Sequence, residues 1–395
     1  MKAGWVTKTL GELLEKTETT NPTNEPEVEF RYVDVSSVSN LTFSVEAVQL
    51  LKGKDAPSRA RKMIRKNDVL FATIRPTLQR IAIVPEELDQ QVCSTGYFVL
   101  RAKPEIDHRF LFYSLFTASF MGQMESLQKG ASYPAVTDGE VKMQNLSYPP
   151  LPEQQRIVAI LDEAFEAIAA ARANAEQNRQ NARALFESYL QSVFSQRGEG
   201  WVEMRLADVS KEFGRGKSKH RPRNDPSLYG GLYPFIQTGD VRNSEHLITA
   251  YSQTYNEIGL AQSKLWPKGT LCITIAANIA ETGILDFDAC FPDSVIGVVA
   301  DESITSTKYL EYLLQSFKTH LQAQGKGSAQ DNINLGTFEN QYFPFADLKK
   351  QTEIVAALDI LNQEIQRLES LYQRKIEALD ELKQSLLQQA FSGNL

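Results

Sequence analysis

Residues 151–162 of the chain read Leu-Pro-Glu-Gln-Gln-Arg-Ile-Val-Ala-Ile-Leu-Asp, and they begin a long stretch that occurs twice. In the second copy, Ile354-Val355-Ala356-Ala357-Leu358-Asp359 aligns with residues 157–162 at an offset of 197 residues. The same offset aligns Phe391-Ser392 with Phe194-Ser195 without a gap. A period this long indicates a duplicated half-molecule rather than a solenoid of short repeats.

Both copies predict a long helix with an apolar seam. No Gly or Pro lies between Pro152 and Gly198 or between Pro344 and Gly393, so nothing interrupts either helix. Apolar residues alternate at spacings of four and three, which is typical of a coiled coil. The residues predicted to form the core of the helix pair are Ile157, Leu161, Ile168, Leu185, Tyr189, Ile354, Leu358, Leu361, Ile365, Leu368, Tyr372, Leu379, Leu382 and Leu386.

The two predicted helices complement each other. The first seam is rich in Ala where the second has Leu or Tyr, which suits packing between two different helices. The polar residues Asn178 and Lys375 occupy the same repeat position and are predicted to set the register. An intramolecular pair would run antiparallel, with one domain at each end of a rod of roughly 65 Å. The alternatives are a hairpin without further function and a dimerisation stalk.

Composition limits the class of protein. The 395 residues provide two or three domains, and 42% hydrophobic content is enough for packed cores. The net charge of −7 argues mildly against nucleic-acid binding when taken alone. The three cysteines show no motif spacing and predict no disulfide framework. Without a recognisable signal peptide or a long apolar run, we expect a soluble, cytoplasmic protein that does not contact a membrane.

The chain divides into four predicted parts. Residues 1–150 and 201–345 are globular, and residues 151–196 and 348–392 are the long helices. Short β-branched and aromatic runs in both globular parts indicate strands beside one helix each. The strands are predicted at 69–74, 80–84, 96–101, 271–275 and 295–299, and the domain helices at 109–127 and 307–322. The expected fold class is therefore α+β: two similar domains separated by an antiparallel coiled coil, with pseudo-twofold duplication.

Catalytic motifs are not found. Gly216-Lys217-Ser218 suggests a phosphate loop, but that motif needs a Gly at position 211, where the chain has Lys. Tyr148 precedes the Pro149-Pro150 pair in place of the acidic or amide residue of an amino-methyltransferase, so we interpret the pair as a helix lead-in. The four histidines have no metal-ligand spacing. We predict neither a catalytic centre nor a metal site.

Positive charge is concentrated in one stretch of each globular part. An acidic chain that keeps a basic cluster in each domain is predicted to use them on phosphates, although a solvated charged face is the alternative. Predicted loops also carry side chains that suit base edges, such as Arg for guanine and Asn or Gln for adenine. The candidate DNA-binding residues are Lys52, Lys54, Arg59, Arg61, Lys62, Arg75, Thr77, Gln79, Ser94, Thr95, Tyr97, Ser132, Tyr133, Arg215, Lys217, Lys219, Arg221, Arg223, Gln237, Thr238, Asn278, Ser294, Ser328, Gln330 and Asn332.

The whole chain resembles the specificity (S) subunit of type I restriction–modification systems. The resemblance is carried by Pro-Pro-Leu-Pro-Glu-Gln-Gln-Arg-Ile-Val at 149–158, by Gly-Ser-Ala-Gln-Asp-Asn-Ile at 327–333 and by Gln-Ala-Phe-Ser-Gly-Asn-Leu at 389–395. The second copy departs from the first motif, because Phe343-Pro344-Phe345-Ala346-Asp347 stands where Pro-Leu-Pro-Glu is expected.

The resemblance implies a non-catalytic subunit with two target recognition domains, each reading half of a split DNA sequence. The helices would set the spacing and dock the partner subunits. The implied partners are double-stranded DNA, two modification subunits that methylate adenine N6 with S-adenosylmethionine, and two restriction subunits that use ATP and Mg²⁺. This chain would bind none of these cofactors. The alternatives are a bivalent DNA-binding regulator and a coiled-coil scaffold without methyltransferase partners.

Overall fold

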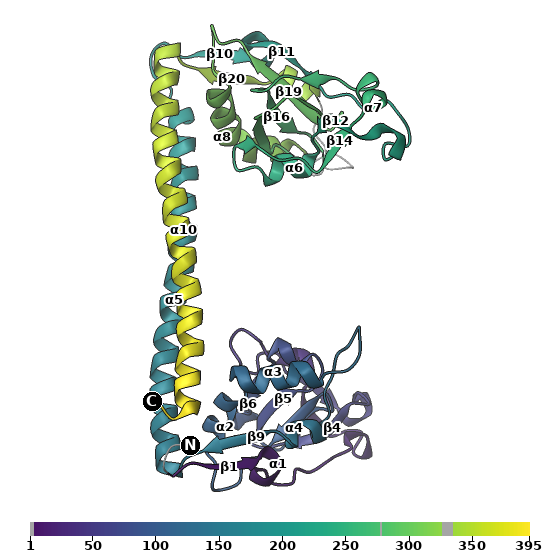
Figure 1. The fold of residues 1–395 in the computed structure, drawn as a ribbon, viewed down its shortest axis with the longest axis vertical. Helices are drawn as coiled ribbons and strands as arrows, with labels where there is room; N and C mark the ends of the chain where they lie inside the picture. The colour runs from purple at the N-terminus through teal and green to yellow at the C-terminus, as the bar shows by residue number, and fades with distance from the viewer. Residues whose placement is uncertain (1–3, 277–278, 326–334) are drawn as a thin grey trace. The chain divides into compact units, whose positions relative to one another are not determined.

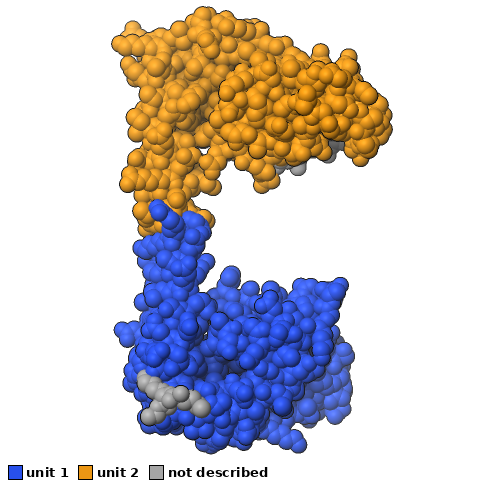
Figure 2. All heavy atoms as spheres, viewed as in Figure 1, with its two compact units in different colours: residues 1–176, 373–395 blue, residues 177–372 orange. Residues whose placement is uncertain are grey.

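The computed structural model describes residues 4–276, 279–325 and 335–395. The chain forms two compact units: unit 1 comprises residues 1–176 and 373–395, and unit 2 comprises residues 177–372 (Figure 2). Each unit contains one α+β domain and a segment of each long helix, α5 (Leu151–Ser195) and α10 (Leu348–Ser392) (Figure 1). The predicted fold class, two α+β domains with paired long helices, is confirmed.

In its described residues, the domain of unit 1 contains three small sheets and four short α-helices. In chain order, the strands are β1 (Val6–Thr9), β2 (Glu29–Val33), β3 (Gln49–Lys52), β4 (Ala60–Ile64), β5 (Val69–Ala72), β6 (Ile81–Ile83), β7 (Gln91–Ser94), β8 (Tyr97–Leu100) and β9 (Asn145–Tyr148). The helices are α1 (Leu10–Leu13), α2 (His108–Ser114), α3 (Ala118–Leu127) and α4 (Asp138–Lys142). The sheet orders are β1-β9, β3-β2-β7-β4 and β6-β5-β8.

The core of this domain lies around β5, whose four residues are all buried. Phe71 of β5 meets Phe120 of α3 edge to face, with ring centroids 5.5 Å apart. The single helix predicted over 109–127 is wrong, because residues 115–117 separate α2 from α3. Thr117 has extended backbone dihedrals, and its side chain accepts a hydrogen bond from the Phe120 N–H, so it caps a new helix.

The domain of unit 2 has a similar plan. Its strands are β10 (Val202–Arg205), β11 (Ser210–Arg215), β12 (Tyr229–Phe235), β13 (Leu247–Ile248), β14 (Gln253–Tyr255), β15 (Leu265–Trp266), β16 (Leu271–Thr274), β17 (Thr282–Leu285), β18 (Ala289–Cys290), β19 (Val295–Ala300) and β20 (Tyr342–Phe345). Its helices are α6 (Thr238–Asn243), α7 (Glu257–Ala261), α8 (Thr307–Gly325) and α9 (Leu335–Glu339). The sheet orders are β10-β20, β11-β19-β16-β17-β13 and β14-β12-β18-β15.

The first and last strands of each domain form an antiparallel pair directly before a long helix. In unit 1 the pair is β1 with β9, and in unit 2 it is β10 with β20. The central strand pairing is repeated as well, because β5 lies between β6 and β8 as β16 lies between β17 and β19. The two domains therefore share a framework that joins both ends of the domain to the start of its helix.

Within each unit the long helices run antiparallel. In unit 1, the Arg172 Nε lies 3.3 Å from an Asp380 carboxylate oxygen, and Arg156 donates to the Leu395 carbonyl at 2.8 Å. In unit 2, Arg183 pairs with Glu369 at 3.1 Å. None of the described helices is long and apolar enough to cross a membrane.

Four apolar residues of α10 are buried at intervals of 11 residues: Ile354, Ile365, Ile376 and Leu387. Eleven residues in three turns correspond to 3.67 residues per turn, and a strict heptad drifts by about 20° per repeat on an undistorted helix. After Ile365 the heptad prediction is wrong at Leu368, Lys375 and Leu382, which are exposed, whereas Tyr372, Leu379 and Leu386 remain partly buried.

Several residues predicted for the helix core lie outside it. Leu368 and Leu382 on α10 are 40% and 46% exposed, and Leu185 and Tyr189 on α5 are 60% and 43% exposed. Asn178 and Lys375 are exposed, so the predicted register role is also wrong. Phe186, Leu190 and Phe194 are buried instead of the two α5 residues. The other predicted core residues are buried or partly buried: Ile157, Leu161, Ile168, Ile354, Leu358, Leu361, Ile365, Tyr372, Leu379 and Leu386.

Candidate nucleic-acid interface

The loop between β5 and β6 in unit 1 has an unusual backbone. It contains a 3-10 turn, Pro76–Leu78, flanked by Arg75 and Gln79, and both flanking residues have left-handed dihedrals with φ of 50° and 54°. The Arg75 N–H donates to the Pro134 carbonyl at 2.6 Å, and Ile74 forms a β-bridge with Ala135. These contacts join the loop to residues 129–135.

A second pair of loops lies beside this one. The Thr95 N–H donates to the Arg59 carbonyl at 2.9 Å. The Gly96 carbonyl accepts from the N–H and the hydroxyl of Thr73, at 2.9 and 3.0 Å. A Cβ at Gly96 would lie 2.5 Å from a methyl group of Val35, so the close approach at this turn requires glycine. The structure therefore places Arg59, Arg75, Thr77, Gln79, Thr95, Ser132 and Tyr133 on neighbouring loops, where all are exposed or partly exposed.

Two candidate residues in the same stretch are buried, and their prediction is wrong. Ser94 is inaccessible, and its hydroxyl accepts a hydrogen bond from the Gly96 N–H at 3.2 Å. Tyr97 is also inaccessible, and its hydroxyl lies 3.1 Å from the Asp34 and Val35 carbonyls, to which it donates. Burial raises the pKa of Tyr97. Both side chains stabilise the domain from within rather than contacting a ligand.

Most of the basic cluster of unit 1 is already paired. Lys52 and Lys54 both lie 3.4 Å from Glu27 carboxylate oxygens. Lys62 lies 2.7 Å from the Asp138 carboxylate and is largely buried. The guanidinium of Arg61 donates to the Ala60 carbonyl at 2.8 Å. Among the candidate arginines in the described part of unit 1, none has a carboxylate partner; Arg59 and Arg75 are exposed, whereas Arg61 is partly buried.

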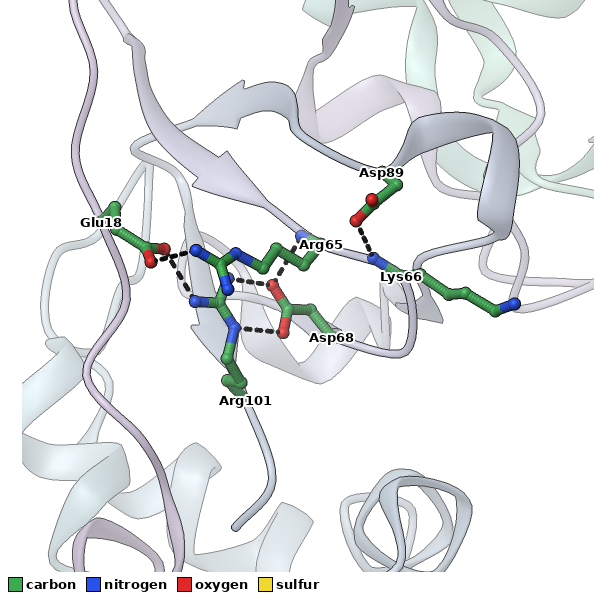
Figure 3. A network of polar contacts seen from close by, with 6 residues as sticks. All are labelled: Glu18, Arg65, Lys66, Asp68, Asp89 and Arg101. Carbon is green, nitrogen blue, oxygen red and sulfur yellow. Dashed lines mark hydrogen bonds and ion pairs between the residues drawn. The ribbon is translucent and has the colours of Figure 1, made fainter. Parts of the chain in front are cut away.

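An interior ion-pair network accounts for further charges of unit 1 (Figure 3). The Arg101 guanidinium donates to both Asp68 carboxylate oxygens, at 2.8 and 2.9 Å, and Asp68 is almost fully buried. Arg101 and Arg65 each also donate to Glu18, at 2.7 and 2.6 Å. The Arg101 hydrogen bond holds the pKa of Glu18 below its usual value. The network ties the amino-terminal segment to β5 and β8, which is a structural role.

In unit 2 the basic candidates lie at the end of β11 and on the loop after it. Gly216 is pressed against the chain, since a Cβ there would lie 2.2 Å from the Phe291 carbonyl oxygen. Arg215 donates to the Asp293 carbonyl at 2.6 Å, and Arg223 forms an ion pair with the Asp293 carboxylate at the same distance. The guanidinium of Arg221 donates to the Ser218 and His220 carbonyls. Lys217 and Lys219 are exposed, and Ser294 beside Asp293 is partly exposed.

The remaining candidates of unit 2 lie elsewhere. The exposed Gln237 donates to the Gln253 side-chain oxygen at 2.7 Å, and Thr238 begins α6. Asn278, Ser328, Gln330 and Asn332 lie outside the described residues. The described residues contain no group of three or more His, Cys, Asp or Glu side chains that could hold a metal ion.

The side chains that attach each domain to its helix were not among the residues predicted from the sequence. In unit 1, Gln154 is fully buried in the first turn of α5. Its amide N–H groups donate to the carbonyls of Pro149 and Glu105, at 2.9 and 3.0 Å. Its oxygen accepts from the Asp107 N–H at 2.8 Å. The side chain thereby links the helix start to the segment that precedes α2.

A buried glutamine makes the same attachment in unit 2. Gln351 lies 197 residues after Gln154 and is also buried. Its amide donates to the carbonyls of Ala346 and Ile304 at 2.9 and 3.0 Å, and its oxygen accepts from the Thr305 hydroxyl at 2.8 Å. The sequence signal for this role is that both copies of the repeat have glutamine at this position, whereas the polar residues next to it differ between the copies.

A second attachment involves an aspartate about two turns further along each helix face. Asp162 accepts a hydrogen bond from the Tyr113 hydroxyl at 2.5 Å, and Asp359 accepts one from the Tyr312 hydroxyl at 2.8 Å. Each aspartate also forms an ion pair with a basic residue of the same domain helix; these residues are Arg109 and Lys308. Burial is the first cause, and the aspartate the second, of the raised pKa of both tyrosines.

Comparisons with known proteins agree with this duplicated architecture. A family model described as the type I restriction modification DNA specificity domain matches residues 2–177 and 198–378. The specificity subunit of the type I restriction enzyme EcoBI of Escherichia coli is 22% identical over 341 residues, which cover 79% of this chain and 70% of that protein. The specificity subunit of the HindI enzyme of Haemophilus influenzae is 31% identical over 140 residues, which cover 34% of this chain and 30% of that protein.

Solved structures extend the similarity to the full length of this chain. The HsdS subunit from Thermoanaerobacter tengcongensis is 30% identical, with a TM-score of 0.66 and coverage of 100% of this chain and 98% of that one. A chain from a study of complex assembly and conformational transition of the type I R-M system is 29% identical, with a TM-score of 0.89 and coverage of 100% and 99%. The family model matches most of the chain in two copies, so the chain belongs to the specificity subunits of type I restriction–modification systems.

Proposed function

We propose that this chain selects the DNA sequence on which a type I restriction–modification complex acts, and that each domain reads one half of a bipartite target. The observation that carries the proposal is the repeated attachment. Gln154 with Asp162, and Gln351 with Asp359, hold two domains in the same way although their surface loops differ. Two domains with different sequence preferences, attached to the long helices in the same way, suit an asymmetric DNA target.

In this proposal, affinity and specificity come from different groups. Exposed cations such as Arg59 and Lys217 contact phosphates, so binding weakens as salt rises. Loop side chains that reach base edges supply the sequence preference. The paired helices act as the spacer between the half-sites.

The outer faces of the long helices are the proposed docking surface for two modification subunits. Leu185, Leu368 and Leu382 lie outside the helix seam, and Ile360 is 65% exposed. Apolar residues repeated along an exposed face mark a protein–protein interface. The proposal assigns S-adenosylmethionine to these partners, and ATP and Mg²⁺ to two restriction subunits, so that this chain binds no cofactor. It places the complex in the cytoplasm.

A domain exchange tests the proposal. The full chain, with residues 1–150 replaced by the corresponding domain of another family member, is produced with its modification subunits in a host without adenine methylation. Single-molecule sequencing then maps methyladenine. We expect a bipartite motif in which one half changes and the other half and the spacer stay the same. A motif in which both halves change, or neither, contradicts the proposal.

A further inference from the structure

The loop containing Arg75 keeps a specific and unfavourable shape. Arg75 and Gln79 both lie in the left-handed region, which residues with a Cβ rarely occupy. The turn between them packs against α3, and Pro76 is buried. Strained residues that the surroundings hold in place are concentrated at functional sites. This loop presents its exposed side chains in one arrangement.

The Arg75 side chain is also held in position. Its guanidinium carbon lies 5.1 Å from the centre of the Tyr133 ring, and one terminal nitrogen donates to the Ser132 carbonyl at 3.1 Å. Tyr133 is 72% exposed, so it is not retained by burial in the core. Among the described residues, no carboxylate pairs with Arg75. Arg65, Arg101 and Arg109 of the same unit, by contrast, are all neutralised by carboxylates.

The surroundings favour a base edge over a phosphate as the partner of Arg75. The rest of the turn exposes Thr77, Leu78 and Gln79, which carry no charge. A planar guanidinium held over an aromatic ring presents a fork of donors that matches two acceptors in one plane. In the major groove of double-stranded DNA, O6 and N7 of guanine form that pair of acceptors.

We propose that Arg75 reads a guanine in the DNA half-site of unit 1, and that Tyr133 is a positioning residue that holds the guanidinium for this contact. The inference rests on the proposed function, because it requires that the domain binds double-stranded DNA. It adds the identity of one base and of the side chain that selects it.

The test uses the full chain assembled with its modification subunits. Binding is measured for the native chain and for Arg75→Ala on the native duplex and on duplexes changed at one half-site position each. We expect Arg75→Ala to weaken binding to the native duplex by roughly ten- to a hundredfold, the loss expected for one bidentate base contact. On the duplex that lacks the guanine, both proteins should bind equally. The methylated motif should become degenerate at that one position.

Arg31→Ala is the matched control. Arg31 is an exposed arginine on β2, and its guanidinium donates to the Glu87 carbonyl at 3.2 Å, near the start of β7. The loop that contains Arg75, by contrast, begins at Thr73, whose N–H donates to the carbonyl of Gly96 beyond the end of β7. This control should leave the motif and the affinity unchanged.

The role of Tyr133 has a separate readout. Tyr133→Ala should lose part of the discrimination at the guanine position, and Tyr133→Phe should restore it, because the ring and not the hydroxyl supports Arg75. In the Arg75→Ala background, Tyr133→Ala should have no further effect on discrimination. Independent losses from the two changes would show that Tyr133 does not act through Arg75.

The outcomes separate this inference from the proposed function. Absence of any bipartite motif with the native chain contradicts the proposed function itself. A bipartite motif that Arg75→Ala leaves unchanged contradicts the inference alone, as does a unit 1 half-site without guanine. A uniform loss on all duplexes, with a shallower salt dependence, would identify Arg75 as a phosphate contact and overturn the assignment.

Discussion

The domains of units 1 and 2 are attached to the long helices by matching side chains, whereas equivalent loops of the domains differ. Thr73-Ile74 after β5 has its counterpart in Thr274-Ile275 at the end of β16, and both loops end in a left-handed residue, Gln79 or Ala280. The loop of unit 1 continues with Arg75, where unit 2 has alanine at 276. Residues that set the position of a domain have been kept, and residues available to a ligand have diverged.

The same contrast appears inside the helix pair. Ile157, Ile168 and Leu190 of α5 occupy the repeat positions of Ile354, Ile365 and Leu387 of α10. The fourth position is Ile376 on α10 but Arg179 on α5. The two helices therefore differ: α5 buries Leu161, Ile168, Ala175 and Ala182 at seven-residue intervals, whereas α10 buries residues at 11-residue intervals.

The largest expected effect comes from substitutions at Ile376 of α10 and at Arg179, which occupies the same repeat position on α5. Replacing the buried Ile376 by Ala should lower the free energy of unfolding of unit 1 by about 2–5 kcal/mol, because it removes apolar contacts and leaves a cavity. Arg179→Ala should cost less than about 1 kcal/mol. Hydrogen exchange of the two units measures both changes. Lys375→Ala, at the exposed neighbouring position, is the control. Equal losses from Ile376→Ala and Lys375→Ala would support the heptad seam instead.

The attachments give the next largest effect. Gln154→Leu should destabilise unit 1, and Gln351→Leu should destabilise unit 2, each by about 1–3 kcal/mol, because each change leaves buried carbonyl groups without donors. Local hydrogen exchange next to α2 and α8 reports the two losses separately. Gln155→Leu changes the exposed neighbour and should have little effect. If one glutamine proves silent, the two attachments are not equivalent.

The smallest expected effect is a difference in pH dependence. Burial lowers the pKa of His108 in unit 1, so the unfolded state binds a proton more readily. The stability of unit 1 should rise as pH increases towards the unfolded pKa of about 6.5. For His246 in unit 2, burial lowers the pKa, but the Glu311 carboxylate beside it and the other nearby carboxylates raise the pKa by more. The pKa of His246 therefore lies above its usual value. The contribution of His246 to the stability of unit 2 is complete below about pH 6.5 and is lost as the pH rises through its higher pKa in the folded state.

The groups around His246 reinforce this direction. Glu311 of α8 lies 3.3 Å from the ring, Asp359 of α10 and Glu245 add negative charge, and Asn362 contacts the other ring nitrogen. Burial raises the pKa of Glu311, which also favours unit 2 at lower pH. Hydrogen exchange at several pH values on His108→Gln and His246→Gln checks both signs. Slopes of the same sign in the two native units would contradict the assignment.

The long helices were predictable because their sequences contain no Gly or Pro beyond Pro152 in the first turn of α5, and such a long uninterrupted sequence has few other options. The exact seam was not, because heptad and 11-residue patterns share most positions over a few turns. Strands such as β2 and β4 were missed because charged residues interrupt their apolar pattern. The burial of Ser94 and Tyr97 depends on neighbours distant in sequence, and a polar residue next to glycine looks like an ordinary loop residue. The burial of Gln154 also depends on residues distant in sequence, so its structural role was not predicted.

The 11-residue spacing of buried residues on α10 has a consequence for changes in its length. At 3.67 residues per turn, seven inserted residues fall short of two turns by about 30°, so the buried positions beyond the insertion would rotate away from their partners. Eleven residues preserve the phase on α10 and add about 16 Å. The buried residues of α5 are spaced by seven, so an insertion that keeps the buried face of one helix shifts that of the other.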